Sequence, residues 1–318
     1  MALGLVPALE VTNIAKTFGD YRAVNSLSFT VPQGSIYGLL GPNGAGKTTT
    51  IRMLMDIIVP DSGGVSFFGQ PFAREHLRRV GYLPEERGLY KKMKILEHLA
   101  FLGEVKGMRT SDAKSKADKW LQRLGLGDWG QKKVEDLSKG MQQKVQFAGA
   151  LIHDPELVIL DEPFSGLDPV NLQVMKDVVV EIARSGRTVL FSTHIMEQAE
   201  RMCDRIVIIA RGEKVVDGTV NEVKAGFGDR NIALTFVSGK EAAERVLADR
   251  ALIAKCDDYG ASAEVSMADG VNPQALLTAL VGAGVGLTRF EVIEPSLQAI
   301  FIAKVGNAGV APANAEAA

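Results

Sequence analysis

The feature that most constrains this chain is a glycine-rich run, Gly41-Pro-Asn-Gly-Ala-Gly46-Lys47-Thr48, which matches the pattern G-x-x-x-x-G-K-[ST]. It follows an apolar segment of strand length, 36–40, and precedes residues with helical spacing as far as Ile57. Glycines in such a turn let successive backbone N–H groups surround a phosphate, and the positive end of the following helix adds to the attraction. The run therefore predicts a phosphate-binding loop in a nucleotide-binding protein.

The two polar side chains that close this loop have separate predicted roles. Lys47 is expected to neutralise the β- and γ-phosphates, and the Thr48 hydroxyl is expected to be a ligand of Mg²⁺. The remaining nucleotide-binding residues predicted here are those that form the cradle: Gly41, Pro42, Asn43, Gly44, Ala45, Gly46 and Thr49. The alternative interpretation is a glycine-rich turn that binds no ligand. It does not explain why a strand pattern and a helical pattern flank the run.

The rest of the chain alternates apolar strands with helical segments, which predicts an α/β fold with a largely parallel sheet covered on both faces. Residues 93–152 hold no clear strand and read as an inserted set of helices. Beyond a boundary near 226–230, the order strand, helix, two strands, helix, strand predicts a small ferredoxin-like α+β unit. The final residues, 305–318, have too little apolar bulk to be ordered alone and are expected to form a flexible tail.

Composition narrows the class of protein. Lysine and arginine number 36 against 38 acidic residues, so a nucleic-acid partner has no support from charge. No apolar run approaches the roughly 18 residues that a membrane span needs. We therefore expect a soluble protein, whose membrane role would depend on a partner.

A second motif follows the apolar strand 157–160, which ends in two adjacent carboxylates, Asp161 and Glu162. At the end of a buried strand beside the loop, Asp161 is expected near the bound metal. Glu162 is then left to orient or polarise the attacking water. Taken alone, the same residues would fit an ordinary core strand that ends in a solvated turn.

The segment Leu137-Ser-Lys-Gly140-Met-Gln-Gln, which lies before these carboxylates and opens a helix, resembles the signature of the ABC (ATP-binding cassette) ATPases. That signature is usually L-S-G-G-Q, so Lys139 and Met141 depart from it. The resemblance implies that Ser138 and Gly140 contact the γ-phosphate of an ATP molecule held by a partner subunit. Ser165-Gly-Leu-Asp168 is similar to the family's D-loop, which lies at the dimer interface.

Three further residues take roles from the same resemblance. His194, in Phe191-Ser-Thr-His194, is similar to the switch histidine that contacts the γ-phosphate, and Phe18 to the aromatic that stacks on adenine. Glu85 occupies the place where the family usually has glutamine. Glutamate at this position supplies a carboxylate that could ligate Mg²⁺. Glu85 is therefore predicted to be a catalytic residue, and also to bind the metal together with Asp161 and Thr48.

The resemblance implies a P-loop NTPase (RecA-like) core with an antiparallel β edge and an inserted helical subdomain at about 91–152. We expect this ATPase domain to span 8–226 and a small C-terminal α+β accessory domain to span 231–304. The segment Val292-Ile-Glu294-Pro295-Ser296-Leu297 looks like the accessory region of some bacterial ABC-2-type exporter ATPases of drug-resistance and sodium-extrusion systems.

The predicted function is thus that of an ATP-hydrolysing subunit on the inner face of the cell membrane. It would work as a homodimer or heterodimer with an integral permease of ABC-2 type, with ATP and Mg²⁺ as cofactors. Two alternatives stay open. A soluble ABC-type ATPase acting on ribosomes or DNA usually has two cassettes or a long coiled coil, and a non-hydrolysing module would not need Glu162 and His194. The family analogy implies that transport is export, and the choice of the transported substance is expected to reside in the permease.

Overall fold

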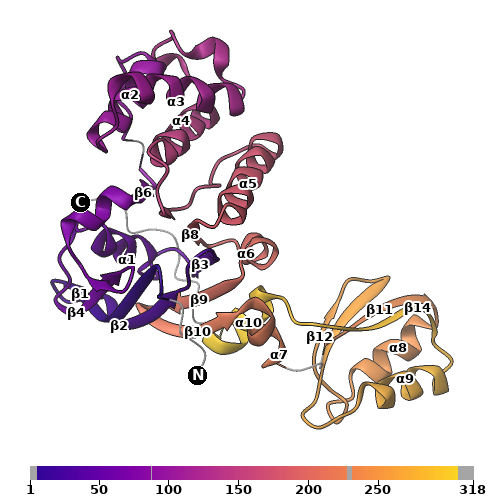
Figure 1. Ribbon diagram of the computed structural model, residues 1–318. Coiled ribbons are helices and arrows are strands. Elements are labelled where there is room, and N and C mark those ends of the chain that lie inside the picture. Colours follow the sequence, from indigo (N-terminus) through magenta and orange to yellow (C-terminus); the bar gives the residue numbers. More distant parts are fainter. Residues whose placement is uncertain (1–5, 87, 228–230, 307–318) are drawn as a thin grey trace. The chain divides into compact units, whose positions relative to one another are not determined.

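The computed structural model describes residues 6–86, 88–227 and 231–306. Within them the chain forms two compact units, one ending at Val220 and the other spanning Asn221–Gly306 (Figure 1). Each unit has its own sheets and its own hydrophobic core. None of the helices in these ranges is long and apolar enough to cross a membrane.

The first unit contains two sheets. An antiparallel sheet has the order β2–β1–β4–β5, formed by β1 (Leu9–Phe18), β2 (Tyr21–Val31), β4 (Ser62–Phe67) and β5 (Gln70–Pro71). A six-stranded sheet has the order β10–β9–β3–β8–β7–β6. Its strands are β3 (Ile36–Leu40), β6 (Val80–Leu83), β7 (Leu157–Leu160), β8 (Thr188–Thr193), β9 (Arg205–Ala210) and β10 (Glu213–Thr219). All of these run parallel except β10, which pairs antiparallel with β9.

This parallel arrangement positions the site. The carboxyl ends of β3, β6, β7 and β8 meet at one edge, and the chain leaves these four strands toward Gly41, Glu85, Asp161 and His194. Ligands in open α/β sheets bind at this edge. Residues that lie up to about 150 positions apart in the chain are therefore neighbours in space.

The core of this unit lies where the two sheets and helix α1 (Lys47–Leu54) meet. Side chains from β1, β2 and β4 pack together with Leu39 of β3, Ile51 of α1 and Ile159 of β7, all of which are fully buried. Because β3, β7 and β8 are buried along their whole length, they carry apolar residues on both faces rather than an alternating pattern. This is why continuous apolar runs predicted them correctly.

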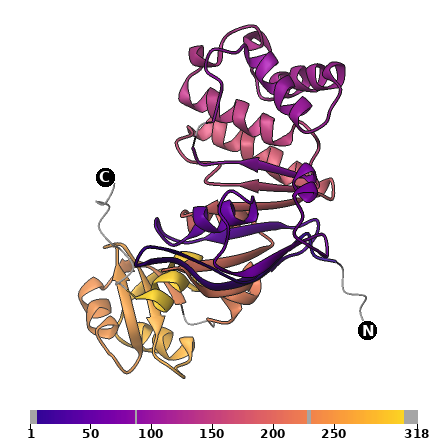
Figure 2. The ribbon, with the colours of Figure 1, turned by 90° about the vertical axis from the view of Figure 1, so that its left-hand side faces the viewer.

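The helices between β6 and β7 form a separate layer at the top of the unit (Figure 2). They are α2 (Ile95–Val105), α3 (Thr110–Arg123) and α4 (Lys139–Leu151), with two short 3₁₀ turns between α3 and α4 (Gly127–Trp129 and Val134–Asp136). Within the described part of this segment the only β pairing is an isolated bridge between Lys94 and Lys133, as the absence of a strand pattern predicted. Two further helices, α5 (Pro169–Arg184) and α6 (Met196–Met202), flank β8, and a 3₁₀ helix (Arg74–Arg79) precedes β6.

The elements of this unit that were not predicted from the sequence include β1, β10 and α6. The alternation in β1 is broken at Asn13, whose φ is +48°, and the pairing with β2 shifts there. Such a bulge interrupts the period of two on which strand prediction depends. Strand β10 lies at the edge of its sheet and is mostly polar, and α6 is only seven residues long.

The second unit has the predicted ferredoxin-like order. It consists of β11 (Asn231–Ser238), α8 (Lys240–Leu247), β12 (Ile253–Asp258), β13 (Ser262–Met267), α9 (Pro273–Gly282) and β14 (Gly286–Ile293). The antiparallel sheet has the order β12–β13–β11–β14, and Leu247 of α8 and Leu280 of α9 pack onto one face of it. Helix α7 (Val220–Ala225) comes before β11 in the chain, and helix α10 (Leu297–Val305) comes after β14. Beyond Gly306, the predicted tail lies outside the described residues.

Candidate active site

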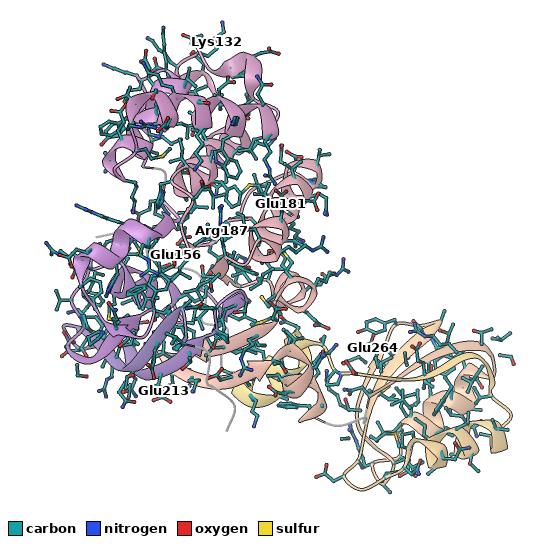
Figure 3. All side chains as sticks on the ribbon, in the orientation of Figure 1. Lys132, Glu156, Glu181, Arg187, Glu213 and Glu264 are labelled. Atoms are coloured by element: carbon teal, nitrogen blue, oxygen red, sulfur yellow. The ribbon has the colours of Figure 1, made fainter. Side chains whose placement is uncertain are left out.

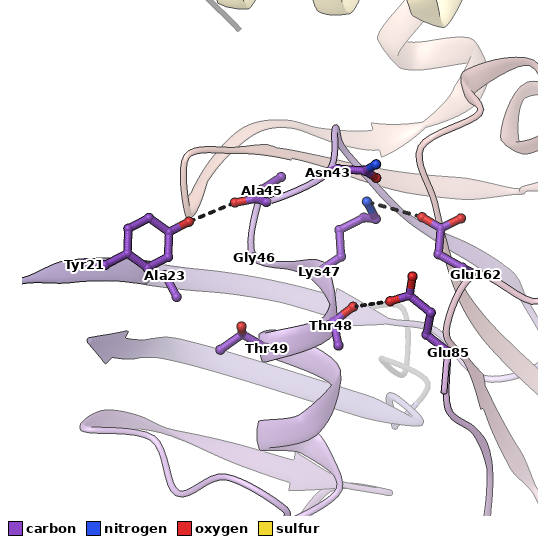
Figure 4. A pocket seen from close by; sticks show the side chains of 11 residues that line it. Tyr21, Ala23, Asn43, Ala45, Gly46, Lys47, Thr48, Thr49, Glu85 and Glu162 are labelled. Atoms are coloured by element: carbon purple, nitrogen blue, oxygen red, sulfur yellow. Dashed lines mark hydrogen bonds and ion pairs between the residues drawn. The ribbon is translucent and has the colours of Figure 1, made fainter. Parts of the chain in front are cut away.

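A pocket of about 360 Å³ opens beside the glycine-rich loop (Figure 4). Most of its lining comes from that loop and from the first turn of α1. The two acidic residues that line it, Glu85 and Glu162, come from the ends of neighbouring strands. The complete lining is Tyr21, Ala23, Asn43, Gly44, Ala45, Gly46, Lys47, Thr48, Thr49, Glu85 and Glu162.

Two glycines of the loop cannot carry a side chain. Gly46 has φ of +103°, and a Cβ atom there would lie 2.4 Å from the carbonyl oxygen of Ala23. A Cβ atom on Gly41 would lie 2.3 Å from the carbonyl oxygen of Ile209. Gly46 is also the N-cap of α1 and offers no side-chain cap, so the first N–H groups of this helix are left for an anion.

Lys47 reaches back over the loop and is almost completely buried, at 6% exposure. Its Nζ donates to the carbonyl oxygens of Gly41 at 2.8 Å and Pro42 at 3.2 Å, and it lies 3.3 Å from Oε1 of Glu162. The Glu162 carboxylate also lies 3.1 Å, through both oxygens, from Nδ1 of His194. A negative group thus stands between a lysine and a histidine at the mouth of a phosphate-binding loop.

Asp161 is fully buried directly before this carboxylate. Its Oδ1 accepts a hydrogen bond of 2.5 Å from the Ser192 hydroxyl, and its Oδ2 has no partner. Burial raises the pKa of the Asp161 carboxyl above its ordinary value. The hydrogen bond from Ser192 and the neighbouring Thr48 hydroxyl lower the pKa, and the nearby charge of Glu85 raises it further. An unpaired buried carboxylate oxygen of this kind calls for a cation.

The donor set around Asp161 suits Mg²⁺. The Thr48 hydroxyl donates to Oε2 of Glu85 at 3.3 Å and lies close to Asp161, so a hydroxyl and two carboxylates meet at one place. Among the described residues there is no group of three or more acidic, histidine or cysteine side chains able to hold a metal. Mg²⁺ needs only one or two carboxylates, because water and substrate phosphates complete its shell.

The structure brings together most of the predicted site residues, although seven of them do not line the pocket. Four of the seven, Gly41, Pro42, Asp161 and His194, lie next to lining residues. The other three are Phe18, Ser138 and Gly140. The Phe18 ring is 46% exposed and has Lys16 Nζ 5.7 Å from its centre. Ser138 caps α4, with Oγ accepting from the N–H of Met141 at 3.3 Å, and Gly140 lies in the first turn of the same helix. Their assignment to nucleotide contacts stays a prediction.

Sequence reasoning also missed lining residues. Tyr21 pairs with Phe18 across the turn between β1 and β2, and its hydroxyl donates to the Gly44 carbonyl oxygen at 3.0 Å. Two aromatics on either side of a tight hairpin were the available signal, but the pattern could not show which one faces the loop. The hydroxyl of Ser192, inside the quoted motif Phe191-Ser-Thr-His194, was also overlooked as a partner of the carboxylates.

Fold and site together define a P-loop nucleotide-binding protein. The family described as "ABC transporter" matches residues 24–165, and the domain described as "ATP-binding protein DrrA1-3-like, C-terminal domain" matches residues 218–305. The uncharacterized ABC transporter ATP-binding protein YhaQ of Bacillus subtilis is 43% identical, over 94% of this chain and 98% of its own length. The linearmycin resistance ATP-binding protein LnrL of the same organism is 33% identical, over 94% and 98%.

Other relatives match the first part of the chain. The Nod factor export ATP-binding protein I of Burkholderia lata is 41% identical, over 67% of this chain and 71% of its own length. A solved ATP-binding subunit of an ABC transporter superposes with a TM-score of 0.65 at 32% identity, covering 70% of this chain and 93% of that structure. The chain therefore belongs to the ATP-binding subunits of the ABC transporters, which bind and hydrolyse ATP.

Proposed function

We propose that this subunit powers export through a separate membrane permease of ABC-2 type. The observation that carries the catalytic part is the Glu162 carboxylate held between Lys47 and His194 at the phosphate-binding loop. The export part is supported by relatives named for linearmycin resistance and Nod factor export, the first of which matches along nearly its whole length. The match of residues 218–305 to a DrrA1-3-like domain supports the same class of transporter.

In the proposed reaction, the N–H groups of the loop and the Lys47 ammonium bind the phosphates of ATP. Glu162 takes a proton from the attacking water, and His194 orients the carboxylate from its other side. Mg²⁺ held by Thr48, Asp161 and Glu85 would neutralise charge on the phosphate oxygens. We assign this activity to residues 8–226, and an accessory role to residues 231–304.

We further propose that the active form is a dimer of ATPase subunits at the inner face of the membrane. Ser138 and Gly140 stand at the N-terminus of α4, a helix end suited to an anion, yet neither lines the pocket of its own chain. That separation supports the family expectation that they complete the site of a partner subunit. ATP would then close the pair, and hydrolysis would reopen it and move the permease.

The catalytic proposal is tested by Glu162→Gln, which keeps the shape of the side chain but removes the base. Steady-state hydrolysis of ATP should fall by ~10² or more, the usual range for a positioned general base. Glu86→Gln is a matched control, because Glu86 is 82% exposed and pairs with Arg52 outside the pocket lining. Unchanged turnover in Glu162→Gln would remove the carboxylate from the mechanism.

The dimer is tested by mixing Lys47→Ala chains with Ser138→Arg chains. In a mixed pair one composite site carries both lesions and the other is intact, so part of the lost ATPase activity should return. If the natural form is a heterodimer with a different chain, mixing the two variants restores nothing, and only that different chain restores activity. Full activity of Ser138→Arg alone would refute a signature that acts in the partner's site.

A further inference from the structure

We infer that Ser192 is a positioning residue for hydrolysis, whose single hydroxyl fixes Asp161 and Glu162 relative to each other. The inference rests on the proposed roles of those two carboxylates and adds a residue that touches neither substrate nor metal. Ser192 lies near the end of β8 and is completely buried.

The hydrogen bonds of Ser192 occupy the hydroxyl in both directions. Its Oγ donates to Oδ1 of Asp161 at 2.5 Å and accepts from the backbone N–H of Glu162 at 2.9 Å. A serine hydroxyl has one proton to donate, so donation to Asp161 leaves only its lone pairs for the N–H of Glu162. The hydroxyl holds Oδ1 in place, while Oδ2 keeps no partner and stays available.

The backbone of Glu162 explains why this support is needed. Its φ is +46°, in the left-handed region that a residue with a side chain enters only at a cost of about 1–2 kcal/mol. Such a conformation persists where the surroundings determine it. Two neighbouring strands hold this turn. The N–H of Asp161 donates to the Leu83 carbonyl oxygen at 2.8 Å on the β6 side, and Ser192 receives the N–H of Glu162 on the β8 side.

The competing explanation is that Ser192 only fills a buried position in the strand. Thr188, in the same strand, provides the comparison, because its hydroxyl accepts a single bond of 3.0 Å from the N–H of Gly34 and touches neither carboxylate. Both hydroxyls are buried, so loss of either should affect folding stability. Only loss of the Ser192 hydroxyl should affect the carboxylates.

The test uses the full chain in four variants: Ser192→Ala, Ser192→Val, Ser192→Thr and, as control, Thr188→Val. Threonine and valine have nearly the same shape, so that pair isolates the hydroxyl. We expect kcat to fall by ~10- to 100-fold in Ala and Val, equivalent to about 1.4–2.7 kcal/mol, and to stay within about threefold in Thr. ATP affinity measured in EDTA should change little, because the loop contacts remain.

A second readout does not depend on turnover. Mg²⁺ should change nucleotide binding, and the Mg²⁺ concentration that gives half of this change is the midpoint. The midpoint should rise several-fold in Ser192→Ala and Ser192→Val, because Asp161 loses the hydrogen bond that orients it. Thr188→Val should lower the unfolding temperature without changing kcat or this midpoint. An equal fall in kcat in Ser192→Thr and Ser192→Val would show that Ser192 only fills space. Unchanged kcat and Mg²⁺ midpoint in all Ser192 variants would show the same.

A double variant separates this inference from the proposed function. If Ser192 acts through Glu162, adding Ser192→Ala to Glu162→Gln should cause little further loss of hydrolysis. A full additional 10- to 100-fold loss would overturn a role through Glu162. If Glu162→Gln alone leaves turnover unchanged, the proposed function fails, whatever the Ser192 variants do.

Discussion

The Lys47–Glu162 ion pair predicts that Glu162→Gln will bind ATP more tightly than the wild type. In the structure the Glu162 carboxylate stands 3.3 Å from the ammonium group that the phosphates should occupy, and both side chains are less than 10% exposed. ATP must therefore displace one anion to bring in another. Glutamine keeps the shape of the side chain but not the charge, so this competition should weaken.

The size of the gain follows from the geometry. At 3.3 Å and an effective dielectric constant of about 20, the gross Coulomb attraction is about 5 kcal/mol, which is an upper bound. The glutamine oxygen can still accept from the Lys47 ammonium, and loss of the charge on the acceptor weakens such a hydrogen bond by about 1–1.5 kcal/mol. We therefore expect a gain near 1–1.5 kcal/mol, or roughly tenfold in Kd.

The assay is an equilibrium titration of ATP by isothermal calorimetry in EDTA, which suppresses hydrolysis. Glu86→Gln should bind as the wild type does. Lys47→Ala should bind more weakly, and adding Glu162→Gln to it should bring no tenfold gain, since the ion pair is already absent. Equal or weaker affinity in Glu162→Gln, or the same gain without Lys47, would refute this reasoning.

Three further outcomes are expected. Glu85→Gln should stay active but need more Mg²⁺ in an ATPase titration, and Glu85→Ala should need still more; superimposable curves would leave Glu85 without a role at the metal. Burial lowers the pKa of His98 to about 4, so the folded state resists a proton that the unfolded state accepts near pH 6.5. Stability should therefore fall as pH drops, by about 2 kcal/mol at pH 5, and thermal unfolding of His98→Phe should show a flatter pH dependence. Phe18→Ala should weaken ATP binding by about 1–3 kcal/mol if its ring stacks on adenine, and unchanged affinity would transfer that role to Tyr21.

The sequence was sufficient for the parts of the site that depend on local pattern. The loop from Gly41 to Thr48 needs glycine for steric reasons that act within a few residues, and the fully buried strands have no polar alternation to misread. The topology then follows, because parallel strands with intervening helices bring their carboxyl ends together. For this reason Asp161 could be placed beside the loop from the strand pattern, whereas Glu85 and His194 were assigned through the resemblance to the ABC ATPases.

The contacts that depend on the exact register between strands could not be predicted. The Ser192 hydroxyl meets Asp161 and Glu162, about thirty residues earlier in the chain, only because β8 lies beside β7 with Phe191 opposite Leu160. A one-residue shift would turn that hydroxyl to the other face of the sheet. Two other features could not be predicted for the same reason. These are the left-handed turn at Glu162 and which of Phe18 and Tyr21 faces the loop, since each depends on atoms distant in sequence.

The order of strands also governs how the chain matures during synthesis. Strand β3, which leads into the phosphate-binding loop, pairs with β8 and β9, whose first residues follow it by more than about 150 positions. At roughly 5–20 residues per second, a ribosome needs on the order of 8–30 s to supply that first neighbour. Until then β3 has no neighbouring strand in its own sheet, and β7, which leads to Asp161 and Glu162, lacks the strand that lies between it and β3. ATP is thus expected to stabilise the nascent chain only late, and a pause after β3 would leave an apolar strand exposed to chaperones.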